Sequence, residues 1–353
     1  MMRLAFFVQM IDPNDTIRGF IPGWVSALAK EVDELVVISQ EINCDDVEQL
    51  GPNVRTFTLG KEQGKGKISQ FLTLASILSD PSKGGRVDAL LTHMNPTYTL
   101  ACSFFMKMRG IPLFTWYAHK EVSWRLKWAE RLSTLCFSAS EESFRLASNK
   151  IRIMGHGIDL THFLEDPSRL FQQKKVLKLI SACRLSPVKG LDLLLTALKE
   201  LQGEWTLDIA GDAPKSDQEH YAEKLKAICP DKRITWHGPV PYVDMPQFLS
   251  KGEVYVNLSK TGSLDKGLLE ALASGLTVLT SNEAFKDFLK GTEKRTYLEN
   301  VTQESLVKRL KEFQKTPRDV LRQDQILLCT RLKKEHNLES FAKKIVSEMK
   351  CVL

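Results

Sequence analysis

Short apolar runs typical of buried strands alternate with amphipathic, helix-like segments along almost the whole of this 353-residue chain. The alternation predicts parallel sheets with helices on both faces, because each parallel strand needs a crossover to reach the next one. In the first half, the predicted strands are residues 4–8, 35–39, 89–91, 113–116 and 134–138, and the predicted helices are residues 23–30 and 69–78.

A second series of the same kind follows a polar, proline-containing segment at residues 166–175. We expect a Rossmann-like domain at 1–168, a second one at 169–335, and a final helix at 336–353 that packs back on the first. Open parallel sheets bind ligands beyond the carboxyl ends of their strands, which predicts a cleft between the domains. The predicted strands of this half are 177–182, 206–210, 234–237, 254–258 and 277–280, and the predicted helices are 191–201, 219–228, 245–251 and 268–274.

The composition excludes several classes of protein. A hydrophobic content of 43% without low-complexity tracts excludes a disordered chain. No apolar run reaches the roughly 20 residues of a membrane-spanning helix. Seven cysteines, an odd number without a CxxC pair, indicate reduced thiols and a cytoplasmic protein. Asp12 and Pro13 interrupt the apolar start of the chain, which therefore predicts a first strand rather than a secretion signal.

The net charge of +6 is modest, and much of the basic excess follows Glu304. A nucleic-acid-binding protein carries a stronger basic stripe, so no nucleic acid partner is expected. The charge indicates at most an anionic ligand or surface.

Two cations frame a short turn between a predicted strand and a predicted helix. Arg184 and Lys189 lie five residues apart in the sequence RLSPVKG. An arginine fork and a lysine near a helix start suit a diphosphate. The alternative is a solvated loop with two ordinary surface cations. If the pair binds a diphosphate, Lys189→Ala should reduce turnover far more than it changes folding.

A glycine-containing loop leads from the strand at 254–258 into the helix that carries Glu270. Backbone N–H groups at such a helix start bind phosphate or sugar oxygens, and a carboxylate one turn further on can accept bonds from ribose hydroxyls. Glu270 is either an exposed helix residue or a buried carboxylate that needs a partner. Gly211 and Gly238 each close a strand, where a glycine lets a ligand approach the backbone.

In this order and on these elements, Arg184, Lys189, Gly211, Gly238 and Glu270 resemble the nucleotide-sugar half of retaining GT-B glycosyltransferases of family four, also called glycosyl transferases group one. The resemblance covers essentially the whole chain and is most specific at residues 259–275. It implies an α/β GT-B fold of two Rossmann-like domains whose parallel sheets face a central cleft. It also implies that Arg184 and Lys189 hold the donor diphosphate and that Glu270 holds the ribose.

The resemblance extends to the first half. Residues 12–23 resemble the family's mobile loop, with Gly19 where the backbone must clear the donor or acceptor. His119 stands where the family has a histidine beside the sugar, although a histidine after a strand is as often structural. His156 is interpreted as a turn residue. The expected catalytic residues are thus Arg184, Lys189 and His119, and the expected donor-binding residues are Gly19, Gly211, Gly238, Val240, Gly262, Ser263, Leu264, Asp265, Lys266, Leu269 and Glu270.

One departure from the family pattern concerns the donor sugar. The family usually carries two glutamates separated by seven residues, and the position of the first is occupied here by Gly262. Asp265, or the backbone of residues 263–266, is the expected substitute.

The resemblance implies transfer of a sugar from a nucleoside diphosphate sugar to a glycan, lipid-linked or small-molecule acceptor, with retention, in glycan or cell-envelope polysaccharide biosynthesis. No metal is expected, since the cations would stabilise the leaving diphosphate and no Asp-x-Asp motif occurs. No cofactor other than the donor substrate is expected. The alternatives are a nucleotide-sugar epimerase of GT-B fold and a non-catalytic nucleotide-sugar-binding subunit.

One segment raises the question of membrane contact. Lys120, Lys127 and Arg131 are expected on one helical face beside a stripe of Trp124, Trp128 and Leu132. Such a face suits a lipid headgroup interface, which would place the protein peripherally on an inner membrane face. The favoured interpretation is that both tryptophans belong to the core of the first domain. The lysines of residues 60–67 either meet an anionic acceptor or are simply solvated.

Overall fold

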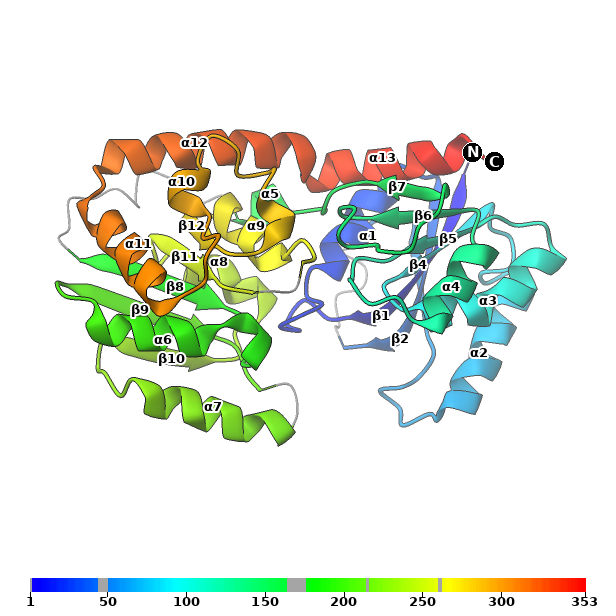
Figure 1. Cartoon of the computed structure of the whole chain (residues 1–353). Helices are drawn as coiled ribbons and strands as arrows, with labels where there is room; N and C mark the ends of the chain where they lie inside the picture. The colour runs from blue at the N-terminus through cyan, green and yellow to red at the C-terminus, as the bar shows by residue number, and fades with distance from the viewer. Residues whose placement is uncertain (1, 44–49, 164–175, 214–215, 260–261) are drawn as a thin grey trace. The chain divides into compact units, whose positions relative to one another are not determined.

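The computed structural model describes residues 2–43, 50–163, 176–213, 216–259 and 262–353. It divides into two compact units (Figure 1). Unit 1 comprises Met1–Asp159 together with His336–Leu353, and unit 2 comprises Leu160–Glu335. The predicted domain boundary at 168/169 and the whole polar segment at 166–175 lie outside the described residues.

A seven-stranded parallel sheet forms the centre of unit 1. Its strands are β1 (Arg3–Ile11), β2 (Glu34–Ile42), β3 (Val54–Thr58), β4 (Ala89–His93), β5 (Leu113–Trp116), β6 (Leu135–Ser138) and β7 (Ile151–Ile153). They lie in the order β3-β2-β1-β4-β5-β6-β7. The central strands are almost fully buried, as expected of a parallel sheet covered on both faces. The sequence analysis missed β3 and β7, the two edge strands, because their side chains are only partly buried and no apolar run marks them.

Helices cover both faces of this sheet (Figure 1). They are α1 (Ile21–Ala29), α2 (Lys67–Ser79), α3 (Pro96–Met108), α4 (Trp124–Leu132) and α13 (Leu338–Lys350). The right-handed crossovers place α1 on one face and α2, α3 and α4 on the other. The terminal helix α13 packs on α1, where the Trp24 and Phe341 rings lie 4.3 Å apart. A Cβ at Gly157 would lie 2.8 Å from side-chain atoms of both Leu338 and Phe341, so a larger residue would force this contact to shift.

The two tryptophans of α4 are not in the core, and this expectation was wrong. Trp124 is 60% exposed and Trp128 is 50% exposed. The buried face of the helix consists of Leu126 and Ala129, so the tryptophans, four residues apart, point the other way. Lys120 precedes the helix and is not part of its face.

Unit 2 contains a five-stranded parallel sheet. Its strands are β8 (Leu177–Ala182), β9 (Trp205–Ala210), β10 (Ile234–Gly238), β11 (Val254–Asn257) and β12 (Thr277–Thr280), in the order β10-β9-β8-β11-β12. Its α-helices are α5 (Leu160–Phe163), α6 (Leu191–Glu200), α7 (Ser216–Ile228), α8 (Met245–Leu249), α9 (Lys266–Ala273), α10 (Glu293–Thr296), α11 (Gln303–Lys315) and α12 (Arg318–Glu335). The strands predicted from the sequence are confirmed here to within one residue at each end.

The strand order of unit 2 reverses at β8. From β8 the chain moves outward through β9 and β10, and then returns to place β11 on the other side of β8. The loops that follow β8 and β11 are therefore neighbours at the carboxyl edge of the sheet. Open α/β sheets bind their ligands at this type of reversal point.

In the part of the chain that the structure describes, no helix combines the length and the apolar content that crossing a membrane requires. The six cysteines of that part are all free thiols.

Candidate active site

The loops after β8 and β11 are in direct contact. Gly190 ends the short 3₁₀ turn Pro187–Lys189 and precedes α6, with a left-handed φ of 68°. A Cβ on Gly190 would lie 2.9 Å from the Cβ of Leu258. Two features therefore favour glycine at position 190: the left-handed backbone conformation and the close approach of the loop after β11.

A buried ion pair joins these two loops. The Lys189 ammonium lies 2.7 Å from Oδ2 of Asp265, and the two side chains are only 13% and 16% exposed. The same carboxylate oxygen accepts a hydrogen bond from Asn257 at 3.0 Å. The other oxygen accepts one from the Gly267 backbone N–H at 3.2 Å and thereby caps α9.

Both members of this pair are held in their charged forms. Burial favours the neutral carboxyl, but the Lys189 charge and the hydrogen bonds outweigh it and hold the pKa of Asp265 below its ordinary value. Burial likewise opposes the charge on Lys189, yet Asp265 raises the pKa of the ammonium above its ordinary value. In this structure Asp265, which was expected to contact the sugar, instead pairs with Lys189 and caps the start of α9.

A second pair lies one turn into α9. The Lys266 ammonium lies 2.9 Å from Oε1 of Glu270 and 5.0 Å from the centre of the Tyr242 ring. Glu270 is 9% exposed, so the alternative of an exposed helix residue was wrong. Lys266 is the partner that a buried Glu270 requires.

The sequence analysis missed the aromatic side of this second pair. The Tyr242 ring stacks on His162 of α5 at 4.7 Å, and His162 Nε2 lies 3.0 Å from the Tyr242 carbonyl oxygen. The Lys266 ammonium therefore lies over the Tyr242 ring, and His162 packs on that ring. The sequence offered one signal, an aromatic residue in the loop after β10, and none for His162.

Gly211 and Gly238 serve different purposes in the structure. Gly211 has a φ of 132°, and a Cβ there would lie 1.8 Å from the Cys183 carbonyl oxygen. Packing against the loop after β8 therefore already requires glycine at this position. Gly238 has a φ of 69°, and no heavy atom lies within 4 Å of the place of its Cβ. Gly238 accepts a hydrogen bond from the Gly211 N–H at 2.7 Å, which joins the two strand ends.

The remaining expected residues of unit 2 differ in exposure. Arg184 is exposed, and no carboxylate of the described residues pairs with it. Leu264 and Leu269 are buried, and Val240 is half-buried. The Ser263 carbonyl accepts a hydrogen bond from the Asn282 side chain at 2.8 Å. Gly262 has a left-handed φ of 61°, a conformation that disfavours a glutamate at this position.

His119 and Gly19 belong to unit 1. His119 is exposed, and its Nδ1 accepts a hydrogen bond from the Glu121 N–H at 3.2 Å. Gly19 is buried and donates to the Asp15 carbonyl at 3.0 Å. His156 donates its backbone N–H to Nδ1 of His336 at 3.0 Å.

The carboxyl edge of the sheet in unit 1 contains a further histidine that the sequence analysis did not single out. His93 ends β4 and is surrounded by the rings of Phe6, Phe20 and Trp24, whose centres lie 5.3–6.2 Å away. The next residue, Met94, has a φ of 62° and is the one non-glycine residue with a positive φ among those described. Such strained residues cluster at functional sites.

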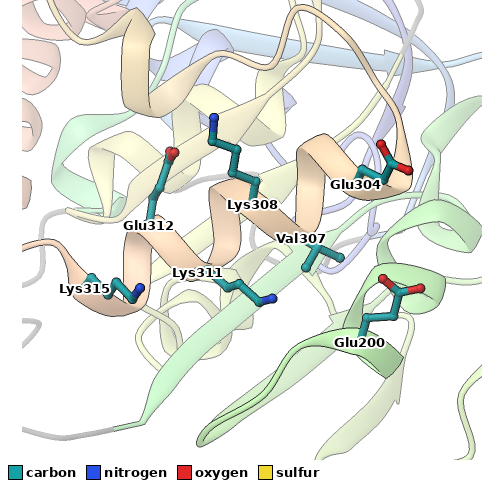
Figure 2. Close-up of a pocket in the computed structure, with 7 residues that line it drawn as sticks. All are labelled: Glu200, Glu304, Val307, Lys308, Lys311, Glu312 and Lys315. Atoms are coloured by element: carbon teal, nitrogen blue, oxygen red, sulfur yellow. The ribbon is translucent and has the colours of Figure 1, made fainter.

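No group of three metal-ligating side chains occurs in the described parts of the chain. A surface cavity of about 490 Å³ lies elsewhere in unit 2, between α11 and the end of α6 (Figure 2). Its lining mixes lysines and glutamates and includes no residue of the two buried pairs. Its lining residues are Glu200, Glu304, Val307, Lys308, Lys311, Glu312 and Lys315.

A family model matches most of the second unit. The sequence model of the family described as glycosyl transferases group 1 matches residues 175–315. The matched range runs from β8 to α11 of unit 2, so this part of the chain is similar to group 1 glycosyltransferases. Both buried ion pairs and Arg184 lie within the matched residues.

A curated relative matches part of the chain. The gpi3 subunit of phosphatidylinositol N-acetylglucosaminyltransferase from Schizosaccharomyces pombe is 27% identical over 140 residues. The match covers 38% of this chain and 30% of the relative. The chain thus spans about a third of the curated relative's length.

Solved structures match the whole chain at low identity. The Anabaena protein Alr3699/HepE in complex with UDP and glucose has a TM-score of 0.78 and 14% identity, with full coverage of both chains. Sucrose-phosphate synthase from Thermosynechococcus elongatus has a TM-score of 0.73 and 14% identity, with 100% and 99% coverage. The chain has the GT-B fold, which confirms the fold expected from the sequence.

Proposed function

We propose that this chain is a glycosyltransferase that moves a sugar from a nucleoside diphosphate sugar to an acceptor. The observation that carries the proposal is the presence of two buried ion pairs, Lys189–Asp265 and Lys266–Glu270, at the carboxyl edge of β8 and β11. Arg184 belongs to the loop after β8 at the same edge, so a diphosphate there would meet three cations. The bound UDP and glucose of Alr3699/HepE support a nucleotide sugar as the ligand class.

In the proposed reaction, Arg184 and Lys189 stabilise the negative charge that develops on the leaving diphosphate. Preorganised cations in a partly buried site stabilise such charge without the reorganisation that water requires. A diphosphate at Lys189 would compete with Asp265 for the ammonium, so binding would be coupled to a rearrangement of this pair. Glu270, paired with Lys266, would accept hydrogen bonds from the ribose hydroxyls.

The finer features of the proposal rest on the family resemblance. We expect retention of the anomeric configuration, no metal requirement and no cofactor beyond the donor substrate. His119 would lie beside the sugar and the acceptor. The acceptor would be a glycan, a lipid-linked sugar or a small molecule of glycan or cell-envelope polysaccharide biosynthesis, in a cytoplasmic protein. The name of the curated relative includes phosphatidylinositol, which makes a lipid-linked acceptor a natural first test.

The sharpest test replaces Arg184. Because Arg184 is exposed and unpaired among the described residues, Arg184→Ala should change the free energy of unfolding by less than about 0.5 kcal/mol. The loss of one group that stabilises developing charge should reduce kcat/KM by about a hundredfold or more. Lys199→Ala, at an exposed lysine of α6, is the matched control and should leave kcat/KM unchanged.

A preliminary experiment identifies the donor. Thermal-shift measurements against nucleoside diphosphates and nucleotide sugars would rank them by stabilisation, because a ligand that binds the native state raises the melting temperature. The best donor is then incubated with candidate acceptors, and the product is examined by NMR for its anomeric configuration, with and without EDTA. Transfer with inversion, or transfer abolished by EDTA, would contradict the retaining or the metal-independent part of the proposal.

One observation favours a second candidate, a non-catalytic nucleotide-sugar-binding subunit. The position of the family's first glutamate is a glycine with a left-handed backbone, so the usual sugar contact is absent there. Nucleotide binding without hydrolysis of the donor or transfer to any acceptor would favour the subunit. Conversion of the bound nucleotide sugar into its epimer would instead indicate an epimerase.

A further inference from the structure

The outer face of three helices in unit 1 is unusually apolar for a surface exposed to water. On α2, Ile68, Phe71 and Leu72 are 80%, 47% and 63% exposed. The described residues include seventeen large hydrophobic side chains that are exposed. Nine of them, including the tryptophans of α4, lie in or next to these three helices. The set, here called the apolar face, consists of Ile68, Phe71, Leu72, Phe104, Met108, Val122, Trp124, Trp128 and Leu132.

Eight of the nine residues of this face lie on neighbouring helices, and Val122 lies just before α4. Helix α3 contacts both α2 and α4, and Figure 1 shows the three helices on one side of the sheet. Phe71 of α2 and Phe105 of α3 have ring centres 6.3 Å apart, and Phe104 lies 5.7 Å from Phe105. The apolar side chains recur with helical spacing on each helix, so they form one outward side rather than scattered single residues.

Basic side chains accompany the apolar face. The three helices carry five basic residues and one acidic residue, Glu130. Glu130 is partly buried and accepts a hydrogen bond from Ser148 at 2.5 Å, so it lies away from the outward side. The five basic residues are Lys67, Lys107, Arg125, Lys127 and Arg131.

On α4 the two kinds of side chain are interleaved. Trp124, Lys127, Trp128, Arg131 and Leu132 follow the spacing of a single helical side. The Arg131 guanidinium lies 5.2 Å from the centre of the Trp128 ring. Tryptophan is the residue that prefers the boundary between apolar chains and water, and arginine and lysine extend their charged ends toward phosphates there.

We propose that the apolar face docks on the surface of an anionic lipid bilayer. The tryptophans, phenylalanines and aliphatic side chains enter the boundary between headgroups and acyl chains, and the surrounding cations pair with lipid phosphates. Charge complementarity selects this occupant: the exposed basic residues would repel a second copy of the same face. Unit 1 would then hold the enzyme at the membrane while unit 2 carries the donor chemistry. The inference concerns unit 1 alone and does not depend on the proposed function.

The test uses the full chain and vesicles of stated composition. Flotation with vesicles of phosphatidylcholine and phosphatidylglycerol at low salt should carry the protein upward, whereas pure phosphatidylcholine should carry much less. Tryptophan fluorescence should shift to the blue on binding, because Trp124 and Trp128 leave water. The partition coefficient should fall with added salt, as expected of screened charges.

Two pairs of variants separate the two contributions. Trp124→Ala/Trp128→Ala removes the apolar contribution, and Lys127→Glu/Arg131→Glu reverses the charge. Each double variant should lower the partition coefficient on anionic vesicles by at least about tenfold. All four positions are exposed, so the thermal melting curve should be unchanged.

The control for charge is Lys308→Glu/Lys311→Glu, which reverses two exposed lysines of α11 beside the cavity of Figure 2. It has the same net charge as the Lys127→Glu/Arg131→Glu variant and should bind vesicles like the wild type. If this control lowered the partition coefficient as much as Lys127→Glu/Arg131→Glu does, net charge alone would explain the effect and the proposal would be overturned. The proposal also fails if anionic vesicles do not bind the wild type, or if the tryptophan variant binds as well. Concentration-dependent self-association that the tryptophan variant abolishes, without vesicle binding, would assign the face to a second copy instead.

Discussion

The carboxyl edges of the two sheets occupy the same place in their topologies and are built from opposite chemistry. In unit 2 the edge holds two buried ion pairs, Lys189 with Asp265 and Lys266 with Glu270. In unit 1 the edge around His93 is lined by aromatic rings. The topology of a parallel sheet therefore fixes where its carboxyl edge lies. The side chains there determine whether that edge is built from ion pairs or from packed aromatic rings.

The two edges differ in what each would lose if one side chain were removed. An aromatic edge depends on filled volume, and a truncation leaves a cavity. A charged edge depends on pairing, and the removal of one partner leaves the other buried without compensation. Mutations of the two edges should therefore differ in their dependence on pH and in whether a second mutation repairs them.

The largest effect is expected at the aromatic edge. Trp24 is 2% exposed, packs on His93, Trp116 and Phe341, and donates its indole N–H to the Gly157 carbonyl at 2.9 Å. Trp24→Ala should lower the free energy of unfolding by about 3–5 kcal/mol. Denaturant titration followed by circular dichroism would measure it. Trp124→Ala, an exposed tryptophan of the same unit, should cost less than about 1 kcal/mol, and equal losses in the two variants would contradict the comparison.

A somewhat smaller effect is expected at the charged edge. Asp265→Asn removes the charge that compensates Lys189 and should lower the free energy of unfolding by about 3 kcal/mol. The same reasoning corrects the expectation for Lys189→Ala, which should also lose stability and therefore cannot report catalysis alone. The double variant Lys189→Met/Asp265→Leu should recover part of the loss, because it leaves no unpaired charge. Strict additivity of the two single effects would argue against the pair as a stabilising unit.

The pH dependence of stability distinguishes the edges further. Because the pKa of Asp265 is lower in the folded chain than its ordinary value near 4, the ionised pair contributes stability above that pH. The contribution is lost as the pH falls through the folded-state pKa and the carboxyl takes up a proton. Asp265→Asn should therefore have a flatter stability profile below about pH 4 than the wild type, whereas the profile of Trp24→Ala should run parallel to it.

The smallest effect is expected at the second pair. Lys266→Met keeps most of the side-chain volume but removes the charge beside Glu270 and Tyr242. The free energy of unfolding should fall by about 1 kcal/mol, because this pair lies within one helix, whereas Asp265 joins two loops and also caps α9. A loss as large as that of Asp265→Asn would contradict this ranking of the two pairs. Denaturant titrations of the two variants at pH 7 make the comparison.

The sequence predicted the central strands well because each is an apolar run buried on both faces. It missed β3 and β7, where edge positions leave polar side chains half-buried and erase the pattern. It also missed α3, whose exposed Phe104 and Met108 blur the amphipathic spacing. The tryptophans of α4 were assigned to the core for a related reason: hydrophobicity alone does not state which side of a helix faces the sheet.

The candidate site shows the same division. Motif order was enough to bring Arg184, Lys189 and Glu270 to one edge, because the loops after neighbouring parallel strands meet there. The pairing of Lys189 with Asp265, and of Lys266 with Glu270, depends on side-chain directions and burial that spacing does not encode. The contribution of His162, which is remote in sequence from the other site residues, could be found only once α5 was placed against Tyr242.

The route of the chain has a consequence for how the protein is made. Unit 1 is assembled from residues before 160 and residues after 335, and Trp24 near the beginning packs on Phe341 near the end. During synthesis on a ribosome, the strands of the first sheet would emerge long before α13. The surface of α1 that α13 covers would therefore stay exposed until the whole of unit 2 had been synthesised. Unit 2 is continuous in sequence and can complete its own core in the meantime. Nascent chains stalled before residue 338 would thus expose the aromatic surface around Trp24, and this interval is where a chaperone that recognises apolar surface would act.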